Sequence, residues 1–331
     1  MRFAFTDEQA MIAETATDLF VGEATSERTR AAMADGSGRD VALWDSLSGT
    51  GFVGVHMPGD VGGSELGMVE LAIIAEAAGR QVAAVPLIAT QAALSALHAD
   101  GRADLIERVL GGQVATLALA GGLAPHGTIA DLFLIEQDGG LVVADRDAVD
   151  VVAGTTMDQT RPLAQVTLTW APIATLSAKA LDAAKHTGWI AVAADALGGA
   201  QACLDRTVEY VKERQQFGQT IGGFQAIKHR LADMMVEIEQ ARSAVYWAAC
   251  AVDEGAEDAE LALHSAKAFA ADAYATCAGA MIQLHGGIGF TWEHDAHLFF
   301  KRAQADRTLF GSSAQHREAI AQIIGLGAIA A

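Results

Sequence analysis

Two segments of the chain carry groups that could bind the phosphates and rings of a nucleotide. The first combines a cation, an aromatic ring and an amide: Arg214, Phe217, Gln225. A guanidinium can donate a pair of parallel hydrogen bonds to phosphate oxygens, an aromatic ring offers a flat apolar face, and an amide donates and accepts hydrogen bonds. The second places a glutamine before two glycines: Gln283, Gly286, Gly287. The bare N–H groups of such a turn can receive a phosphate oxygen. The alternative interpretation of the two segments is that they bind no nucleotide and form only a helix-loop-helix with a surface arginine and a glycine-rich helix end.

Long helical patterns must position both segments. Apolar residues recur at helical spacing over four ranges: 177–213, 225–252, 257–284 and 313–324. The first range would form a helix roughly 50 Å long. Because short loops join these long patterns, we expect antiparallel neighbours and a four-helix bundle. The nucleotide-binding groups then lie in the turn between two bundle helices and at the end of a third.

The rest of the chain predicts helices followed by short strands. Thr6 and Gln9 have the spacing of a capping box, and helical patterns cover residues 43–47 and the stretch from Ser64 onward. Short β-favouring runs follow at 114–119, 132–135, 141–143, 149–152 and 166–170, with a hairpin turn at 137–140. We expect an α+β, mostly α chain with three domains. They are a helical domain (1–112), a shortened β domain (113–175) and a C-terminal four-helix bundle (176–331).

Composition excludes several classes of function. The chain has 331 residues, 51% of them hydrophobic, with Lys plus Arg at 22, Asp plus Glu at 41 and a net charge of −19. This charge argues against nucleic-acid and anionic-membrane partners. The sequence has no signal peptide or membrane span, so we expect a cytoplasmic protein. Its three cysteines suit reduced core thiols.

Two further sets of side chains are candidates for reactive groups. His294 and His297 stand three residues apart, but no third ligand is spaced to complete a metal site, so we expect no metal and a solvated helix start instead. Asp195 is a lone carboxylate in an apolar run. If buried, it would have a raised pKa and could act as a base. The alternative is that Asp195 has no catalytic role and that its carboxylate is satisfied by contacts with a neighbouring helix or water.

The motifs resemble those of the acyl-CoA dehydrogenases. Arg-x-x-Phe-Gly-x-x-Ile-x-x-Phe-Gln occupies 214–225 and Gln-x-x-Gly-Gly-x-Gly-Phe occupies 283–290. In this family both segments reach across a dimer interface to FAD that is held mainly by the other subunit. The resemblance therefore implies FAD contacts from the matching positions: Arg214, Gln216, Phe217, Gln225, Gln283, Gly286 and Gly287.

The chain departs from the family where the catalytic base belongs. The family removes a proton α to the thioester and passes a hydride from the β carbon to flavin N5. Many members carry the catalytic glutamate just before a Gly-Thr-Ser segment, and this chain has Phe310 there. A smaller branch carries it on the preceding long helix, where the matching residue is Gly188. Neither residue can accept a proton. The β domain also lacks the family's segments that serve the flavin ring after its first strand.

The resemblance then implies one subunit of a heteromeric enzyme. The family contains bacterial α2β2 enzymes acting on CoA esters of steroid side chains, in which one chain has lost the base. The expected cofactor is FAD shared with a larger acyl-CoA dehydrogenase subunit in a heterotetramer. The substrate would be an acyl-CoA and the electron acceptor a protein such as electron-transfer flavoprotein. Two alternatives stay open: a non-catalytic scaffold, and a self-sufficient homomer that uses Asp195 or another carboxylate. The retained FAD-contact residues favour the heteromer.

Overall fold

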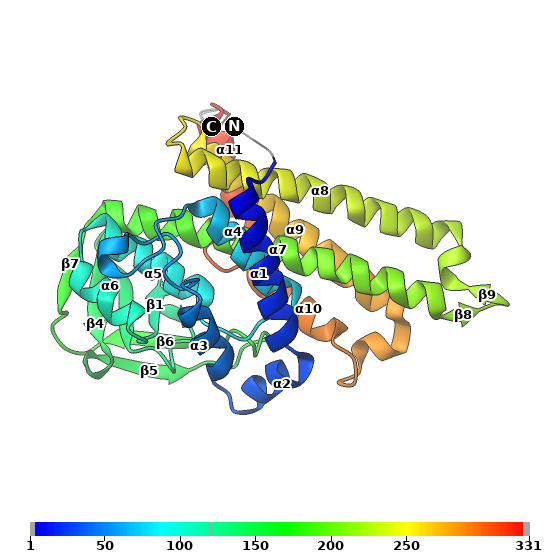
Figure 1. Ribbon diagram of the computed structural model, residues 1–331, viewed down its shortest axis with the longest axis horizontal. Coiled ribbons are helices and arrows are strands. Elements are labelled where there is room, and N and C mark those ends of the chain that lie inside the picture. Colours follow the sequence, from blue (N-terminus) through cyan, green and yellow to red (C-terminus); the bar gives the residue numbers. More distant parts are fainter. Residues whose placement is uncertain (1–3, 120, 327–331) are drawn as a thin grey trace, which may run out of the picture.

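The chain folds into an array of helices with a small β region at one end (Figure 1). The computed structural model describes residues 4–119 and 121–326. The N-terminal part contains α1 (Asp7–Glu23), α2 (Ser26–Ala34), α3 (Val41–Gly49), α4 (Met68–Arg80), α5 (Leu87–Ala99) and α6 (Ala103–Leu110). The later helices are α7 (Ala178–Glu213), α8 (Gln225–Asp253), α9 (Ala259–His285), α10 (Ala296–Asp306) and α11 (Ser313–Ile323). The predicted fold class, α+β and mostly α, is confirmed.

Local chemistry sets where the first helices begin. The Thr6 hydroxyl accepts the Gln9 N–H at 3.2 Å and the Gln9 side chain accepts the Thr6 N–H at 3.0 Å, so the predicted capping box is present. Helix α4 begins at Met68, later than the sequence pattern indicated. Its first N–H groups, those of Met68 and Val69, donate to the carboxylate of Asp253 at 2.8 and 3.2 Å. A cap from a distant helix therefore fixes this start.

The β region forms two small sheets. The first has the order β1 (Ala115–Ala118), β3 (Leu132–Gln137), β4 (Gly140–Asp145), β7 (Ala174–Leu176), and the second has the order β2 (Leu123–Pro125), β6 (Leu163–Leu168), β5 (Val149–Ala153). Among the strand pairs of the two sheets in the described residues, β1 with β3 is the only parallel one. The predicted hairpin joins β3 to β4, with Asp138 and Gly139 at φ 52° and 79°, as a type I′ turn requires. The three-residue strands β2 and β7 were not predicted.

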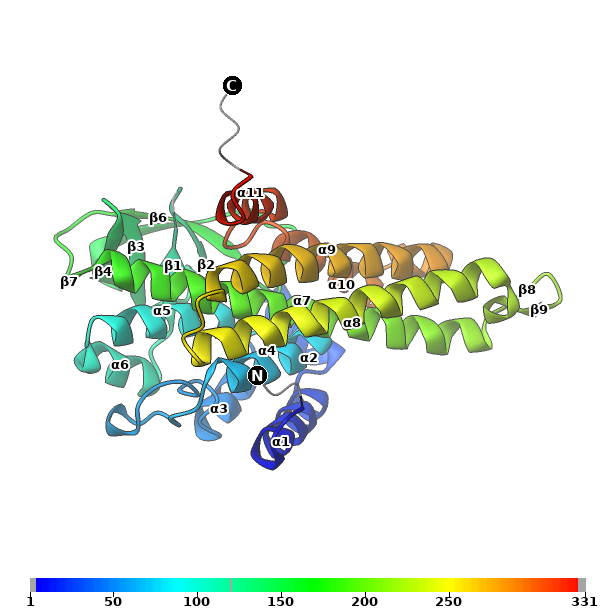
Figure 2. The ribbon, with the colours of Figure 1, turned by 90° about the horizontal axis from the view of Figure 1, so that it is seen from above.

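Helix α7 is the central helix of the structure (Figure 2). Its first half packs with α5 and the first sheet in one hydrophobic core, and its second half packs with α8, α9 and α10 in another. Glycines allow helix α4 to cross it closely, since a Cβ on Gly198 would lie 1.9 Å from the carbonyl oxygen of Glu76. All four predicted bundle helices form, with α11 packed on α9. The element type changes near both predicted domain boundaries, but the division into three domains stays a prediction.

Candidate functional site

The arginine motif forms an exposed turn at the far end of the bundle. Helix α7 ends at Glu213, and Arg214 caps it by donating its backbone N–H to the Tyr210 carbonyl at 2.9 Å. A small hairpin of β8 (Gln215–Gln216) and β9 (Gln219–Thr220) follows. Phe217 and Gly218 form its turn with φ of 54° and 83°, and the Phe217 side chain is 93% exposed. A large aromatic ring held in a left-handed turn and pointing into solvent contributes little to this chain's own core.

The glycine motif lies at the same end. Helix α9 ends at His285, and Gly286 turns the chain at φ 64° and ψ −142°, a conformation open essentially to glycine. The Tyr210 hydroxyl donates to the His285 carbonyl at 3.2 Å, and the two rings stack with centroids 4.3 Å apart. Gln283, Gly286 and Gly287 are exposed. The fold therefore brings both predicted segments together on one open surface.

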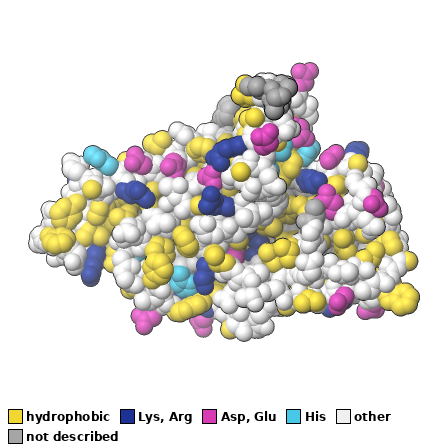
Figure 3. All heavy atoms as spheres, turned by 180° about the vertical axis from the view of Figure 1, so that it is seen from behind, with side chains coloured by type: hydrophobic (Ala, Val, Ile, Leu, Met, Phe, Trp, Pro, Cys, Tyr) yellow, Lys and Arg dark blue, Asp and Glu magenta, His cyan; other side chains and the backbone are white. Residues whose placement is uncertain are grey.

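Hydrophobic side chains gather on this end of the molecule, which lies at the left in Figure 3. Besides Phe217, large hydrophobic side chains are exposed in and just after the glycine motif: Ile288 at 43%, Phe290 at 79% and Trp292 at 61%. An exposed apolar group of this kind is typical of a protein interface. Three exposed cations, Arg214, Lys228 and Arg230, belong to the arginine motif and to the first two turns of α8, and no carboxylate of the described chain lies at ion-pair distance from any of them.

The two positions where the family keeps its base meet in a different place. Phe310 follows α10, and Gly188 lies in the first half of α7. A Cβ on Gly188 would be 2.9 Å from two ring carbons of Phe310. The ring therefore occupies the space above Gly188, and neither position offers a proton acceptor. The assignment of Gly188 to the family's alternative base position stays a prediction.

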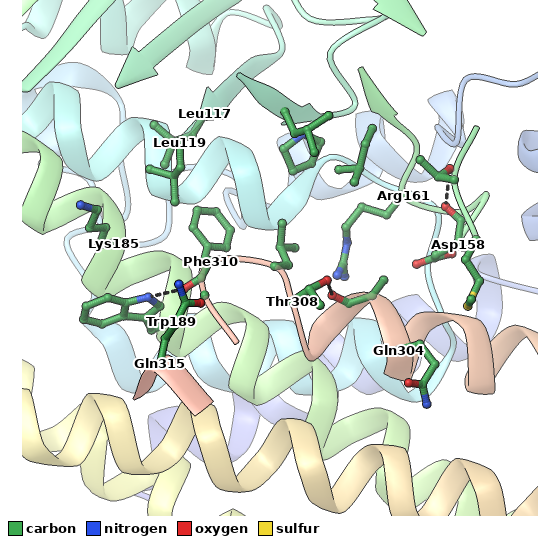
Figure 4. Close-up of a pocket in the computed structure, with 18 of the residues that line it drawn as sticks. Leu117, Leu119, Asp158, Arg161, Lys185, Trp189, Gln304, Thr308, Phe310 and Gln315 are labelled. Atoms are coloured by element: carbon green, nitrogen blue, oxygen red, sulfur yellow. Dashed lines mark hydrogen bonds between the residues drawn. The ribbon is translucent and has the colours of Figure 1, made fainter. Parts of the chain in front are cut away.

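Phe310 is held at the wall of a pocket of about 780 Å³ (Figure 4). Its backbone has a φ of 57°, which is unfavourable for a bulky side chain. Neighbouring donors fix the segment: the Trp189 indole N–H donates to the Phe310 carbonyl at 2.8 Å, and the Lys267 ammonium donates to the Gly311 carbonyl at 2.6 Å. Burial lowers the pKa of Lys267 to about 8. Polar groups below the ring thus keep Phe310 in its strained conformation.

Asp195 does not enter this pocket, and its predicted raised pKa is wrong. The carboxylate is buried and pairs with Arg302 and with Arg161, each at 3.1 Å. Burial by itself would raise the pKa of Asp195, but these two guanidinium charges hold it below its ordinary value. Burial and the nearby Asp195 raise the pKa of Asp306 well above its ordinary value, although the Arg161 charge opposes this rise. Asp195 is therefore an ion-pair partner, and the alternative that a neighbouring helix satisfies it is the correct one.

The histidines considered for metal binding have other contacts. His294 accepts the Ala296 N–H through Nδ1 at 3.1 Å, and His297 packs edge-on against Trp292 with centroids 4.5 Å apart. Among the described residues, no three metal-ligating side chains lie close enough together to hold a metal ion. Within residues 4–119 and 121–326, no helix is long and apolar enough to cross a lipid bilayer. Cys203 and Cys277 are buried free thiols.

The contact between Gly188 and Phe310 predicts a coupled pair of mutations. Gly188→Ala is expected to lower the free energy of unfolding by about 1–2 kcal/mol, because the added methyl group collides with the ring. The loss should shrink in a Phe310→Ala background. Gly279→Ala is the matched control: it lies in α9, where an added Cβ would meet no atom within 4 Å, and it should raise stability by about 0.5–1 kcal/mol. Thermal unfolding of the four variants measures the coupling, and additive losses would show that the ring does not restrict Gly188.

Comparison with known proteins identifies the family. The N-terminal domain of acyl-CoA dehydrogenase matches residues 6–116 and the C-terminal domain matches residues 183–325. The acyl-CoA dehydrogenase IpdE2 of Mycobacterium tuberculosis is 37% identical over 311 residues, which cover 92% of this chain and 94% of that protein. IpdE2 of Mycolicibacterium smegmatis is 34% identical over 308 residues, covering 92% and 95% of the two chains.

A solved structure extends the similarity to the whole fold. A chain of the Tcur3481-Tcur3483 steroid ACAD variant is 29% identical, with a TM-score of 0.90 over 98% of this chain and 99% of that chain. The chain belongs to the acyl-CoA dehydrogenase family.

Proposed function

We propose that this chain is the base-lacking subunit of a heteromeric, FAD-dependent acyl-CoA dehydrogenase. It contributes Arg214, Gln216, Phe217 and Gln225, with the turn from Gln283 to Gly287, to an FAD whose ring lies in a partner subunit. The partner supplies the catalytic base and most of the flavin pocket. The reaction is the α,β-desaturation of an acyl-CoA thioester, with a protein such as electron-transfer flavoprotein as the acceptor.

The distance between the two sites of this chain carries the proposal. Arg214 follows Gly188 by 26 residues on one continuous helix, which corresponds to about 40 Å. The arginine motif therefore cannot serve the pocket at Phe310 by direct contact. Its side chains face solvent, so a cofactor bound there would need a second protein surface to enclose it. A shared site at a subunit interface meets both conditions.

The charge pattern supports an anionic ligand at the exposed end. The chain carries a net charge of −19, yet the exposed cations Arg214 and Lys228 have no ion-pair partner in the described part of the chain. The N-terminus of the 29-residue helix α8 lies beside them, and no side chain caps it. Free N–H groups and unpaired cations favour a pyrophosphate there.

The substrate class is proposed from the relatives and from the missing base. The Tcur3481-Tcur3483 structure is that of a steroid ACAD, and its similarity to this chain covers nearly the full length of both. We therefore propose CoA esters of steroid side chains as substrates of the heterotetramer. Phe310 and Gly188 leave this chain unable to take the α proton, so the partner's base must do so.

Flavin stoichiometry tests the shared site. The chain purified alone is expected to bind FAD weakly, because most of the proposed flavin pocket lies in the partner and the β region is short. Co-expressed with a longer acyl-CoA dehydrogenase subunit that has an intact glutamate, it should form a complex with bound FAD. Absorbance at the flavin bands measures both preparations. Stoichiometric FAD in the lone chain would support a self-sufficient homomer, and a stable complex with neither flavin nor activity would support a scaffold.

A further inference from the structure

We propose that the pocket at Phe310 is a second ligand site, which binds a neutral, flat, mainly apolar ring compound and performs no chemistry on it. The pocket has a volume of about 780 Å³, which is within the range of sites for small organic molecules. Protein interiors are otherwise close-packed, so a hollow of this size beside the strained Phe310 segment is a feature that packing alone does not require. The proposal does not rest on the shared FAD site, which lies at the other end of α7.

Two apolar walls define the shape of the ligand. Leu117, Leu123 and Leu163 come from strands of the two sheets and form one wall. Ala305, Leu309 and Phe310, from α10 and the segment after it, form the other. In Figure 4 the labelled leucines and Phe310 approach the hollow from opposite sides. A slot between two apolar surfaces buries both faces of a planar or nearly planar ring system and gains most from an uncharged one.

The charged groups of the pocket are already neutralised. Lys185 pairs with Glu136 at 3.2 Å at one end. Arg161, whose side chain is 5% exposed, pairs with Asp195 at 3.1 Å and also with Asp306 near the other end. A carboxylate or phosphate ligand would have to compete with these internal pairs, whereas a neutral ligand leaves them intact. Gln304 and Gln315 add amides at the edge that can donate to carbonyl or hydroxyl oxygens of a ligand.

Chemistry at this site is excluded by the same residues. Phe310 and Gly188 fill both family positions, and Asp195 is held in ion pairs with Arg161 and Arg302. The two carboxylates that line the pocket are also paired, Glu136 with Lys185 and Asp158 with Arg302. A ligand bound here is therefore held unchanged. Such a site would let the subunit bind a ring compound while desaturation takes place at the interface.

A matched pair of charge variants tests the site. Leu123 and Val152 are 52% and 57% exposed, and both lie directly opposite Gln165 in the second sheet, but only Leu123 lines the pocket. Androst-4-ene-3,17-dione is the probe because it is rigid, flat and uncharged. We expect saturable binding of one probe molecule per full-length chain by equilibrium dialysis. Leu123→Glu should weaken this binding at least about tenfold by placing a charge in the apolar wall, and Val152→Glu should leave it unchanged.

A second blocking variant protects the test from a folding defect. Ala305→Trp lies on α10 in the opposite wall and should fill the slot, so it is also expected to abolish saturable binding while circular dichroism shows intact helices. Riboflavin should not displace the probe. Absence of saturable binding would overturn the proposal. So would equal affinity of the parent, Leu123→Glu and Ala305→Trp chains, and displacement by riboflavin would assign the pocket to a flavin instead. None of these outcomes depends on whether the partner subunit shares FAD.

Discussion

Replacing Arg302 with methionine is expected to lower the free energy of unfolding by about 3–5 kcal/mol. The Arg302 side chain is 2% exposed and donates to Asp158 at 2.6 Å, to Asp195 at 3.1 Å and to the Ala83 carbonyl at 3.1 Å. Methionine preserves much of the volume but leaves two buried carboxylates with only Arg161 as a cation. The loss arises from uncompensated charge, because a buried carboxylate without its partner is strongly disfavoured.

The pH dependence separates this cause from simple loss of packing. In the parent chain burial alone would raise the pKa of Asp158, but Arg302 and Arg161 hold it below its ordinary value. This carboxylate therefore contributes stability above its unfolded-state pKa and loses it as pH falls through the lower folded-state pKa. Without Arg302 the folded-state pKa should rise instead. The difference in stability between Arg302→Met and the parent should then be smaller at pH 5 than at pH 8.

Arg317→Met provides the matched control. Arg317 pairs with Asp272 at 2.6 Å, but its side chain is 56% exposed. Solvent screens such a pair, so its loss should cost no more than about 1 kcal/mol and show no comparable pH dependence. Denaturant titrations at both pH values measure the three chains. Equal losses for Arg302→Met and Arg317→Met would show that the buried network does not govern stability.

Arg214→Ala should release FAD from the proposed heteromeric complex with a loss of about ten- to a hundredfold in affinity. The proposed guanidinium–pyrophosphate contact is a charge-assisted hydrogen bond, worth about 1.5–3 kcal/mol. Arg214 is exposed and its backbone, not its side chain, caps α7, so the fold of this chain should be unaffected. The mutated subunit contains no base, and a loss of flavin would therefore show that it contributes to the cofactor site in trans.

Two further variants distinguish the arginine fork from charge alone. Arg214→Lys keeps the charge but loses the planar pair of donors, and it should recover only part of the affinity. Lys212→Ala removes a cation two residues away, one that pairs with Glu209 at 2.6 Å and is 61% exposed, and it should leave FAD binding unchanged. Flavin titration of the reconstituted complexes measures each constant. If Arg214→Ala binds FAD like the parent, the motif does not hold the cofactor and the proposed interface site is wrong.

The sequence alone predicted the features that depend on neighbours along the chain. The capping box at Thr6 and Gln9, the hairpin at Asp138 and Gly139 and the long helices around Arg214 are local, because their hydrogen bonds and backbone angles involve residues a few positions apart. The family motifs are equally local. Helix α5 was not predicted, and the reason is physical: every residue from Leu87 to Leu97 is buried, so no polar face reveals a helical period.

Tertiary structure decided what the isolated residues do. Asp195 and Arg302 are separated by 107 positions, and no local pattern indicates that this cation lies against that carboxylate and lowers its pKa. Gly188 and Phe310 are in contact only because α7 passes beneath the segment after α10. The wide separation of the arginine motif from the Phe310 pocket follows from the unbroken length of α7. Residue types and spacing determined which groups the chain carries, but long-range packing determined their charge, their partners and the surface they share, because burial and Coulomb energy depend on distance in space.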